Sequence, residues 1–300
     1  MFKFLEIKTS LGSICEKNFL LEKKLKFEKG AIDKKIGIKK RFISNQNQTT
    51  ESLAASAIAQ LSQKSKNLNF SHIISVTNTP SILFPNYSHS ILAKLKKNIN
   101  NTHCVNINAG CTGFVDCLII ANSFLKDKKK ILIVTADTYS KYIEKNDRSI
   151  RPIFSDGASA TVISYYKHGW KIKDILTSTK INTEKYLCFN QGSFIRMNGA
   201  EVLNFFLEDV MPNIIKFTQT NKKTLLLVHQ AGKIILDIVK KKINNINIQI
   251  PTNYHLFGNL VSTSIPFIMK DYLKKFNNYE RIIISGFGVG LSQSHVVLER

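Results

Sequence analysis

A short stretch of the sequence, NINAGC at residues 106–111, decides the expected fold. It ends in small and polar residues, and a helical pattern follows directly at residues 113–125. Buried parallel strands that lead into crossover helices have this form. The sequence LVHQ at residues 227–230 repeats the arrangement before a helical pattern at residues 233–242. We therefore expect an α/β protein with Cys111 and His229 at the carboxyl edges of its strands.

Further apolar runs and amphipathic stretches extend this pattern over both halves of the chain. The alternation predicts a βαβ-type unit in each half, and a pseudo-symmetric duplication would bring the two strand edges together. We place the junction in the turn material of residues 167–169, so that residues 1–166 carry the cysteine and residues 167–300 the histidine. The other expected strands are residues 73–76, 131–134, 225–228 and 282–284, and the other expected helices are residues 51–63 and 200–218.

Composition limits the class of protein. A chain of 300 residues with 43% hydrophobic side chains, 14 glycines and 6 prolines is globular rather than disordered or collagen-like. The net charge of +22 suggests a polyanionic partner. Only six of the 43 basic residues are arginine, however, and an AT-rich genome would produce such a lysine bias. Because specific nucleic-acid readers favour arginine, we do not expect nucleic-acid binding.

The cysteines and the start of the chain indicate the compartment. Five cysteines without a CxxC motif argue against a disulfide framework and against a tetrahedral zinc site. Charged residues interrupt positions 1–20, and no apolar run reaches the roughly 18 residues of a membrane span. We expect a cytoplasmic protein without a membrane span. Four cysteines are expected to be small buried hydrophobes: Cys15, Cys104, Cys117 and Cys188.

Three side chains could carry chemistry. Cys111 has small neighbours that allow a sharp strand-to-helix turn, and the helix N-terminus is expected to lower the pKa of its thiol toward that of a nucleophile. His229 should emerge at a sheet edge, where a lone histidine is often only a satisfied polar group. Asn259, in the sequence FGNLVSTSIP at residues 257–266, would by itself be a turn former or N-cap.

With the sequence motifs around them, these three residues make the chain resemble the β-ketoacyl-acyl-carrier-protein synthase III family of the thiolase superfamily, and the resemblance extends over most of the chain. Seven motifs in order carry the resemblance. They are Gly37-Ile38 with Arg41, the nucleophile segment at residues 108–114, the FSDGASA turn at residues 154–160, Met197-Asn198-Gly199 with Glu201-Val202, His229-Gln230-Ala231, Gly258-Asn259 with Ser264-Ile265-Pro266, and the glycine loop at residues 286–291.

The resemblance implies a duplicated, thiolase-like α/β/α/β/α fold and a decarboxylating condensation. In that reaction Cys111 accepts an acyl group from a thioester, and His229 and Asn259 stabilise the enolate of a malonyl-carrier substrate. It also implies a homodimer whose partners are an acidic acyl carrier protein and a coenzyme A thioester, with no metal or cofactor. Further implied sites are an oxyanion hole (Cys111, Gly288, Val289), a substrate pocket (Phe84, Phe154, Met197) and carrier or coenzyme A contacts (Lys40, Arg41, Lys233).

Related families differ from this chain at single positions. Thiolases carry a second catalytic cysteine in the loop that corresponds to residues 286–290, where this chain has none. Elongating synthases carry a histidine at the position of Asn259. The chain also departs from the family that it resembles, with Gly232 in place of a common asparagine, Lys233 as the basic residue after it, and no tryptophan before Gly37. Two alternatives remain: an acyltransferase that passes the acyl group to an alcohol or amine, and a catalytically silent partner subunit.

Overall fold

The computed structural model describes residues 1–61, 70–95, 101–125, 129–190 and 192–300. The first half of the chain forms one five-stranded sheet. In spatial order its strands are β1 (Phe2–Leu11), β7 (Gly157–Tyr165), β6 (Lys130–Asp137), β4 (Phe70–Val76) and β5 (His103–Ile107). Strands β5, β4 and β6 are parallel to one another, and β7 and β1 run antiparallel to their neighbours.

The second half repeats this topology in a second five-stranded sheet. Its first three strands are parallel and the last two antiparallel, so each strand has a counterpart in the first sheet. This correspondence confirms the predicted duplication. In the matching order, from the parallel edge, the strands are β12 (Ile248–Gln249), β11 (Thr224–Val228), β13 (Arg281–Gly288), β14 (Ser292–Glu299) and β8 (Lys171–Thr179).

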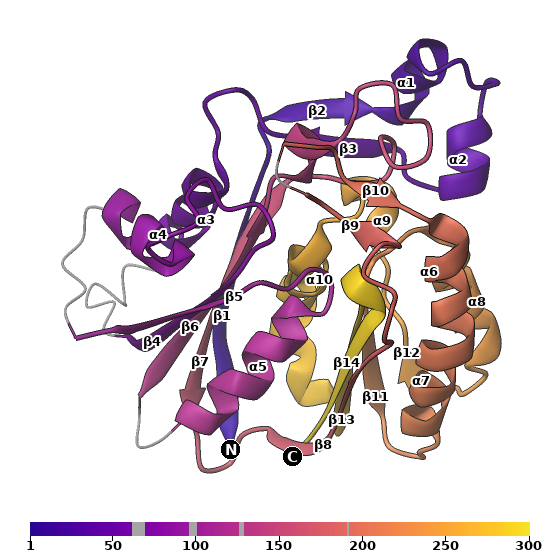
Figure 1. Cartoon of the computed structure of the whole chain (residues 1–300). Coiled ribbons are helices and arrows are strands. Elements are labelled where there is room, and N and C mark those ends of the chain that lie inside the picture. The colour runs from indigo at the N-terminus through magenta and orange to yellow at the C-terminus, as the bar shows by residue number, and fades with distance from the viewer. Residues whose placement is uncertain (62–69, 96–100, 126–128, 191) are drawn as a thin grey trace.

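Helices form three layers around the two sheets (Figure 1). Between the sheets lie α5 (Gly113–Phe124) and α10 (Ser264–Tyr272), and α3 (Thr50–Ala59) and α4 (Tyr87–Leu95) cover the outer face of the first sheet. The second sheet is covered by α6 (Gly199–Phe205), the π-helical turn η3 (Phe206–Val210), α7 (Met211–Thr218) and α8 (Lys233–Lys242). The predicted α/β/α/β/α layering is therefore confirmed.

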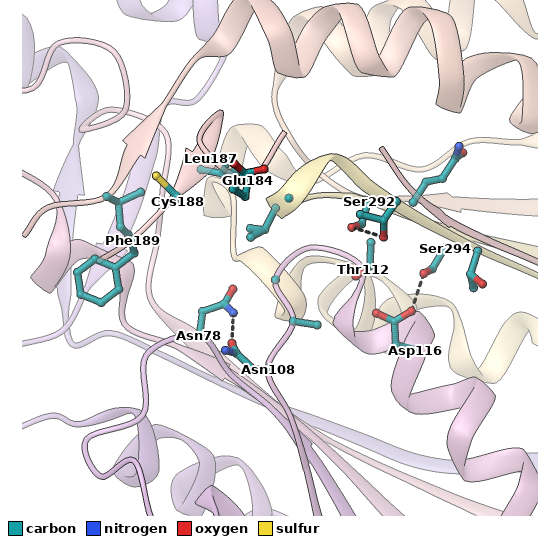
Figure 2. A pocket seen from close by; sticks show the side chains of 18 of the residues that line it. Asn78, Asn108, Thr112, Asp116, Glu184, Leu187, Cys188, Phe189, Ser292 and Ser294 are labelled. Carbon is teal, nitrogen blue, oxygen red and sulfur yellow. Dashed lines mark hydrogen bonds between the residues drawn. The ribbon is translucent and has the colours of Figure 1, made fainter. Parts of the chain in front are cut away.

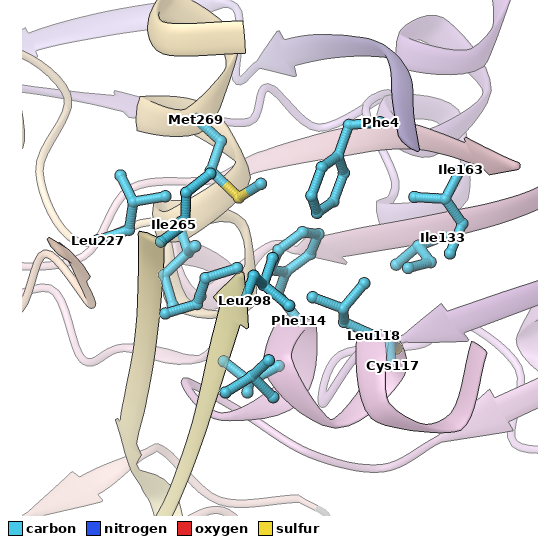
Figure 3. Packing of buried hydrophobic residues seen from close by; sticks show 14 of the residues in the cluster. Phe4, Phe114, Cys117, Leu118, Ile133, Ile163, Leu227, Ile265, Met269 and Leu298 are labelled. Atoms are coloured by element: carbon cyan, nitrogen blue, oxygen red, sulfur yellow. The ribbon is translucent and has the colours of Figure 1, made fainter. Parts of the chain in front are cut away.

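The layer between the sheets holds the two halves in register. Phe114 and Leu118 of α5 pack with Ile265 and Met269 of α10 in one continuous core that reaches both sheets (Figure 3). The Phe114 side chain is fully buried. Removing a phenylalanine ring from such a core costs about 3–5 kcal/mol of the free energy of unfolding. This packing fixes the loops that precede α5 and α10 relative to each other.

Short elements gather over the carboxyl edges of the parallel strands, at the top of Figure 1. They tie loops from both halves together and enclose the space above the sheets. They are β2 (Ile14–Lys17), α1 (Asn18–Lys24), α2 (Ala31–Ile36), β3 (Lys40–Ile43), β9 (Leu187–Cys188), β10 (Arg196–Met197) and α9 (Tyr254–Phe257), with the short helical turns η2 (Tyr139–Tyr142), η4 (Val261–Thr263) and η6 (Val289–Leu291). The remaining turn, η5 (Leu273–Asn278), leads into the amino end of β13, and its Phe276 packs against Phe4 and Trp170.

The predicted element bounds hold to different degrees. α8 spans the predicted residues, and α5 ends one residue before the predicted position. The predicted helix at residues 200–218 is interrupted by η3, and residues 62 and 63 of the predicted helix at 51–63 lie outside the described residues. The strands change from one sheet to the other after Tyr165. We keep the division of the chain at residue 166 as a proposal.

The cysteines only partly follow expectation. All five are free, and Cys117 is buried in α5 as predicted. Cys15 is exposed and Cys104 and Cys188 are half-buried, so the prediction that all four non-catalytic cysteines are buried is wrong. Cys15 lies on the short strand β2, which pairs with β3 in a separate two-stranded sheet and is not part of the core of either large sheet.

None of the described helices is both long and apolar enough to cross a membrane.

Candidate active site

The duplication places two of the expected side chains at equivalent positions. Cys111 lies between β5 and α5, and Asn259 lies between their counterparts β12 and α10. His229 directly follows β11, and its backbone N–H donates to the Ser285 carbonyl of β13 at 2.9 Å. Each residue therefore stands at a carboxyl edge of its sheet, as the sequence predicted.

These three side chains line one cavity of about 200 Å³. Gly288, Phe154 and Met197 line it as well. Most of its wall is apolar: Ile36, Ile153, Leu187, Val202, Leu203, Ile235 and Phe287. The structure thus brings together a thiol, an imidazole and a carboxamide in a largely dry environment.

Cys111 is held in a buried position at the base of this cavity. Its side chain is only 4% exposed and packs against Tyr139, Phe154 and Val261. The backbone N–H groups of Val289 and of Cys111 itself lie beside the thiol, where they favour its thiolate form. N–H donors beside a sulfur could also hold the oxyanion of a thioester carbonyl that the sulfur attacks.

Burial, with a smaller contribution from the nearby Asp137 carboxylate, nevertheless raises the pKa of the Cys111 thiol to about 12. The Val289 and Cys111 N–H groups act in the opposite direction, but the loss of hydration outweighs them. The expectation that the start of α5 lowers this pKa is therefore wrong for the empty site. In the empty site the thiol is therefore neutral near pH 7.

This pKa predicts how Cys111 reacts with a small alkylating agent. Only the thiolate reacts, and its fraction grows close to tenfold per pH unit while the pH is below the pKa. We expect the iodoacetamide rate at Cys111, followed by peptide mass spectrometry, to rise steadily from pH 7 to pH 9.5. A plateau below pH 8 would show instead that the helix terminus and N–H donors dominate.

His229 is held as a neutral imidazole. It is 1% exposed, and burial lowers its pKa to about 3. Its ring stands edge-on to Phe287, with the ring centroids 5.6 Å apart, and its Nδ1 atom is buried without a hydrogen-bond partner among the described residues. A neutral imidazole keeps one N–H donor at every physiological pH, so His229 can donate without carrying charge.

Asn259 is fixed by its own backbone and by its side-chain oxygen. It forms a parallel bridge with Phe154, its N–H donates to Ile153 O at 3.0 Å, and its Oδ1 accepts from Val261 N–H at 2.9 Å. Val261 has a φ of +52°, an unfavourable conformation for a β-branched residue. With Oδ1 occupied and no described side chain accepting from Nδ2, the amide N–H₂ remains as a donor for a ligand.

Gly288 is required by close packing against Cys111. A Cβ atom there would lie 2.9 Å from both Cβ and Sγ of Cys111, and the residue has a φ of +154°. A side chain at position 288 would push the thiol away from the Val289 N–H group. The glycine loop thus sets the position of the second N–H donor.

Basic residues stand at one side of the cavity. Lys233 begins α8, lines the cavity, and pairs with Asp237 at 2.6 Å while its side chain stays 44% exposed. Lys35 and Ile36 of α2 line the same side. Lys40 is half-buried on β3 with its ammonium 5.7 Å from the Phe42 ring centroid, outside the cavity lining. Sequence reasoning missed Lys35, although it stands two residues before the Gly37-Ile38 motif.

Arg41 corrects an expectation. It was expected to contact a carrier or coenzyme A, but its side chain is fully buried and burial lowers its pKa to about 9. Its guanidinium pairs with Glu16 and donates to Asn18 Oδ1 and to Phe154 O, each at 3.0 Å. Arg41 therefore holds the loop that carries Phe154 and cannot reach an external partner.

Phe84 lies elsewhere on the molecule. Its side chain is 84% exposed, and it does not line the cavity around Cys111. Ile82 and Leu83 beside it are also exposed. Within a single chain, Phe84 is therefore not part of the expected substrate pocket, whereas Phe154 and Met197 are.

Asp137 was not recognised from the sequence. It is fully buried at the end of β6, and burial raises its pKa to about 7. Its carboxylate accepts from Asn78 N–H at 2.9 Å and from the Ser262 hydroxyl at 2.8 Å, which connects loops of the two halves beside Cys111. The signal in the sequence that could have indicated this residue is its position directly after the apolar run ILIVTA at residues 131–136.

Comparison with known proteins identifies the family. Residues 105–180 match the family model of 3-oxoacyl-[acyl-carrier-protein] synthase III, and residues 218–300 match the model of its C-terminal part. The chain is 30% identical over 297 residues to the β-ketoacyl-[acyl-carrier-protein] synthase III of Streptococcus sanguinis, and the match covers 89% of each protein. The chain belongs to the β-ketoacyl-acyl-carrier-protein synthase III family.

Other members of this family agree. The β-ketoacyl-[acyl-carrier-protein] synthase III of Clostridium botulinum is 31% identical over 291 residues, with 87% of each protein covered. The crystal structure of 3-oxoacyl-[acyl-carrier-protein] synthase III from Aquifex aeolicus superposes with a TM-score of 0.86 at 26% identity and covers 100% of both chains. The predicted resemblance is confirmed, and the chain is a condensing enzyme of the acyltransferase class.

Proposed function

We propose that the chain joins an acyl starter to a malonyl group on an acyl carrier protein and releases carbon dioxide. The observation that carries this proposal is the shared cavity of Cys111, His229 and Asn259, with two backbone N–H donors on the thiol. The family membership of the chain supports the same reaction class.

In the first step the sulfur of Cys111 attacks the thioester carbonyl of the starter. A carbon–sulfur bond forms to Cys111, the bond to coenzyme A or carrier breaks, and the leaving thiolate takes up the thiol proton. The N–H groups of Cys111 and Val289 stabilise the oxyanion that forms in between. A thioester carbonyl bound to the sulfur would lie near both donors, because both act on that sulfur.

In the second step the malonyl thioester loses its carboxylate as carbon dioxide. The electron pair left behind forms an enolate, whose oxygen accepts hydrogen bonds from the neutral His229 imidazole and the Asn259 amide. The enolate carbon attacks the acyl carbonyl, and the Cys111 thiolate leaves. Every electron pair comes from the substrate or the thiolate, so the reaction requires neither a metal nor a redox cofactor.

The free amide of Asn259 separates this proposal from the two alternatives. Simple acyl transfer to an alcohol or amine forms no enolate, so it gives the buried N–H₂ group nothing to stabilise. A silent subunit would have no use for a thiol, an imidazole and a carboxamide around one cavity. We therefore favour condensation.

We also propose a cytoplasmic location, which the five free cysteines support.

One incubation tests the proposal. The protein is mixed with a panel of acyl-CoAs and malonyl-carrier protein, and its intact mass and the released carbon dioxide are measured. Acylation of Cys111 with carbon dioxide release supports condensation. Acylation alone would point to acyl transfer, and neither signal would point to a silent subunit.

We further propose a homodimer in which Phe84 lines the acyl pocket of the partner. Its exposed ring, with Leu83 71% exposed beside it, would lose apolar surface to water on association. Phe84→Ala is expected to shift acyl chain-length preference toward longer starters, measured as relative kcat/KM across the panel. The control Leu20→Ala, at an exposed leucine of α1, should change nothing. A monomer by size-exclusion chromatography at micromolar concentration would contradict this prediction.

The carrier is proposed to dock beside Lys233 and Lys40. A positive surface near the cavity steers an acidic carrier protein and raises its association rate. We expect Lys40→Glu with Lys233→Glu to reduce turnover with malonyl-carrier protein but not with malonyl-CoA, and the loss should shrink as salt screens the charges. The control Lys274→Glu lies on η5, outside the cavity lining. Equal loss on both substrates would contradict docking at this surface.

A further inference from the structure

A second cavity adjoins Cys111 on its other side. It has a volume of about 560 Å³ and is lined by Gly110, Tyr139, Val289, Asn78 and Asn108 (Figure 2). Leu187 lines both cavities. Gly110 and Val289 line the second cavity, whereas their chain neighbours Cys111 and Gly288 line the first.

The order of the proposed reaction assigns different contents to the two cavities. The malonyl thioester must reach His229 and Asn259, which line the first cavity. The starter is then already attached to Cys111, and a cavity of about 200 Å³ cannot hold both groups and the thioester arm. In this scheme the acyl chain of the starter would extend into the second cavity, which Gly110 and Thr112, the chain neighbours of Cys111, line.

The wall of the second cavity nearest Cys111 is polar. Tyr139 donates its hydroxyl hydrogen to Asn78 Oδ1 at 3.0 Å, and Asn78 Nδ2 donates to Asn108 Oδ1 at 2.6 Å. Figure 2 shows the side chains of Asn78 and Asn108 pointing toward each other. This chain leaves one N–H of Asn78 and the N–H₂ of Asn108 without a partner among the described side chains.

This polar row lies close to the nucleophile. A Cβ atom on Gly110 would lie 2.9 Å from Asn78 Oδ1 and 2.5 Å from Val289 Cγ2. Asn78 therefore packs directly on the backbone that precedes Cys111. The first few carbons of a starter attached to Cys111 would meet these amides.

The rest of the lining disfavours an acidic starter. Hydroxyl and amide groups continue the polar surface, and two carboxylates, Asp116 and Glu184, line it as well. Among the described residues that line this cavity there is no lysine, arginine or histidine, although the chain carries a net charge of +22. Asp116 already accepts from the Ser294 hydroxyl at 2.5 Å, and an acidic acyl group would face repulsion.

We propose that the starter is a short, neutral acyl group with a hydrogen-bonding substituent such as a hydroxyl, which Asn78 and Asn108 bind. This inference rests on the proposed function, because it concerns the group carried by Cys111. An alkyl starter would cover the free amide N–H groups without giving them an acceptor, and that loss disfavours it. A starter that carries an ammonium group is disfavoured for the same reason, because an ammonium offers donors and no acceptor.

The test compares matched starters on the wild-type protein. Rates of Cys111 acylation are measured by intact mass with butyryl-CoA, 3-hydroxybutyryl-CoA, succinyl-CoA and 4-aminobutyryl-CoA. We expect the hydroxylated starter to load about five- to tenfold faster than butyryl, the effect of one or two hydrogen bonds. Equal or faster loading of butyryl, or a preference for either charged starter, would overturn the inference.

Two variants link the preference to the amides. Asn108→Leu keeps the size of the side chain and removes its polarity, and it should abolish the preference for the hydroxylated starter. Tyr139→Phe removes the hydroxyl that orients Asn78 and should weaken the preference. The control Asn122→Leu, at an exposed residue of α5 outside the cavity, should retain it. A preference unchanged in Asn108→Leu and Tyr139→Phe would overturn the assignment.

Failure of the inference and failure of the proposed function give different results. If butyryl loads as fast as 3-hydroxybutyryl and carbon dioxide release follows, the condensation stands and only the starter class is wrong. If no acyl thioester loads Cys111, both are wrong.

Discussion

The Cys111→Ala variant is expected to take up no acyl group from any acyl thioester. Cys111 is the one thiol among the described residues that lines the cavity with His229 and Asn259, and it has two backbone N–H donors on its sulfur. Without the thiol, the carbonyl carbon of the starter has no nucleophile, so loading and condensation should both fall below detection. Intact-mass measurement after incubation with the acyl-CoA panel checks this directly.

A matched cysteine provides the control. Cys117 lies six positions along the chain, on α5, and its side chain is fully buried in the core between the sheets. Cys117→Ala should therefore load at the wild-type rate despite a similar change in composition. Acylation that persists in Cys111→Ala, or that disappears in Cys117→Ala, would contradict the assignment of the nucleophile.

His229→Ala and Asn259→Ala are expected to load normally and to fail in condensation. Each residue supplies one donor to the enolate oxygen, and loss of one such donor typically reduces the rate by about 10²–10³-fold. The thiol and its N–H donors remain in both variants, so acylation should stay measurable. Pre-steady-state mass measurements give the loading rate, and carbon dioxide release gives the rate of decarboxylation.

Asn259→Asp distinguishes loss of the donor from loss of structure. Aspartate retains the oxygen that accepts from Val261 N–H and replaces the N–H₂ donor with a second oxygen of an acidic group. We expect it to lose decarboxylation as severely as the alanine variant while it keeps the fold. Equal damage to loading and decarboxylation in the three variants at His229 and Asn259 would refute the division of labour between the two steps.

The sequence predicted the duplicated fold because both halves carry the same local signals. A short apolar strand that ends in small or reactive residues before a helix is visible at Cys111 and at His229 without any tertiary information. α8 even has the predicted bounds, because Gly232 precedes it and its apolar residues recur at helical spacing. The convergence of the two edges follows from the duplication.

Other properties depend on tertiary packing and could not be predicted in the same way. Arg41 stands among surface lysines in the sequence, and only the fold places Glu16 and Asn18 around its guanidinium. The pKa of Cys111 depends on how deeply the thiol is buried, which the helix N-terminus does not reveal. The polar second cavity is built from segments more than 100 residues apart, such as those of Asn78 and Val289.

A single turnover of pre-acylated enzyme tests the central claim most directly. The protein is loaded at Cys111, freed of excess thioester, and mixed with malonyl-carrier protein labelled in its free carboxylate. The account predicts that one labelled carbon dioxide is released for each acyl group lost from Cys111, with the same time course and with β-ketoacyl-carrier as the product. Loss of the acyl group without labelled carbon dioxide would contradict it.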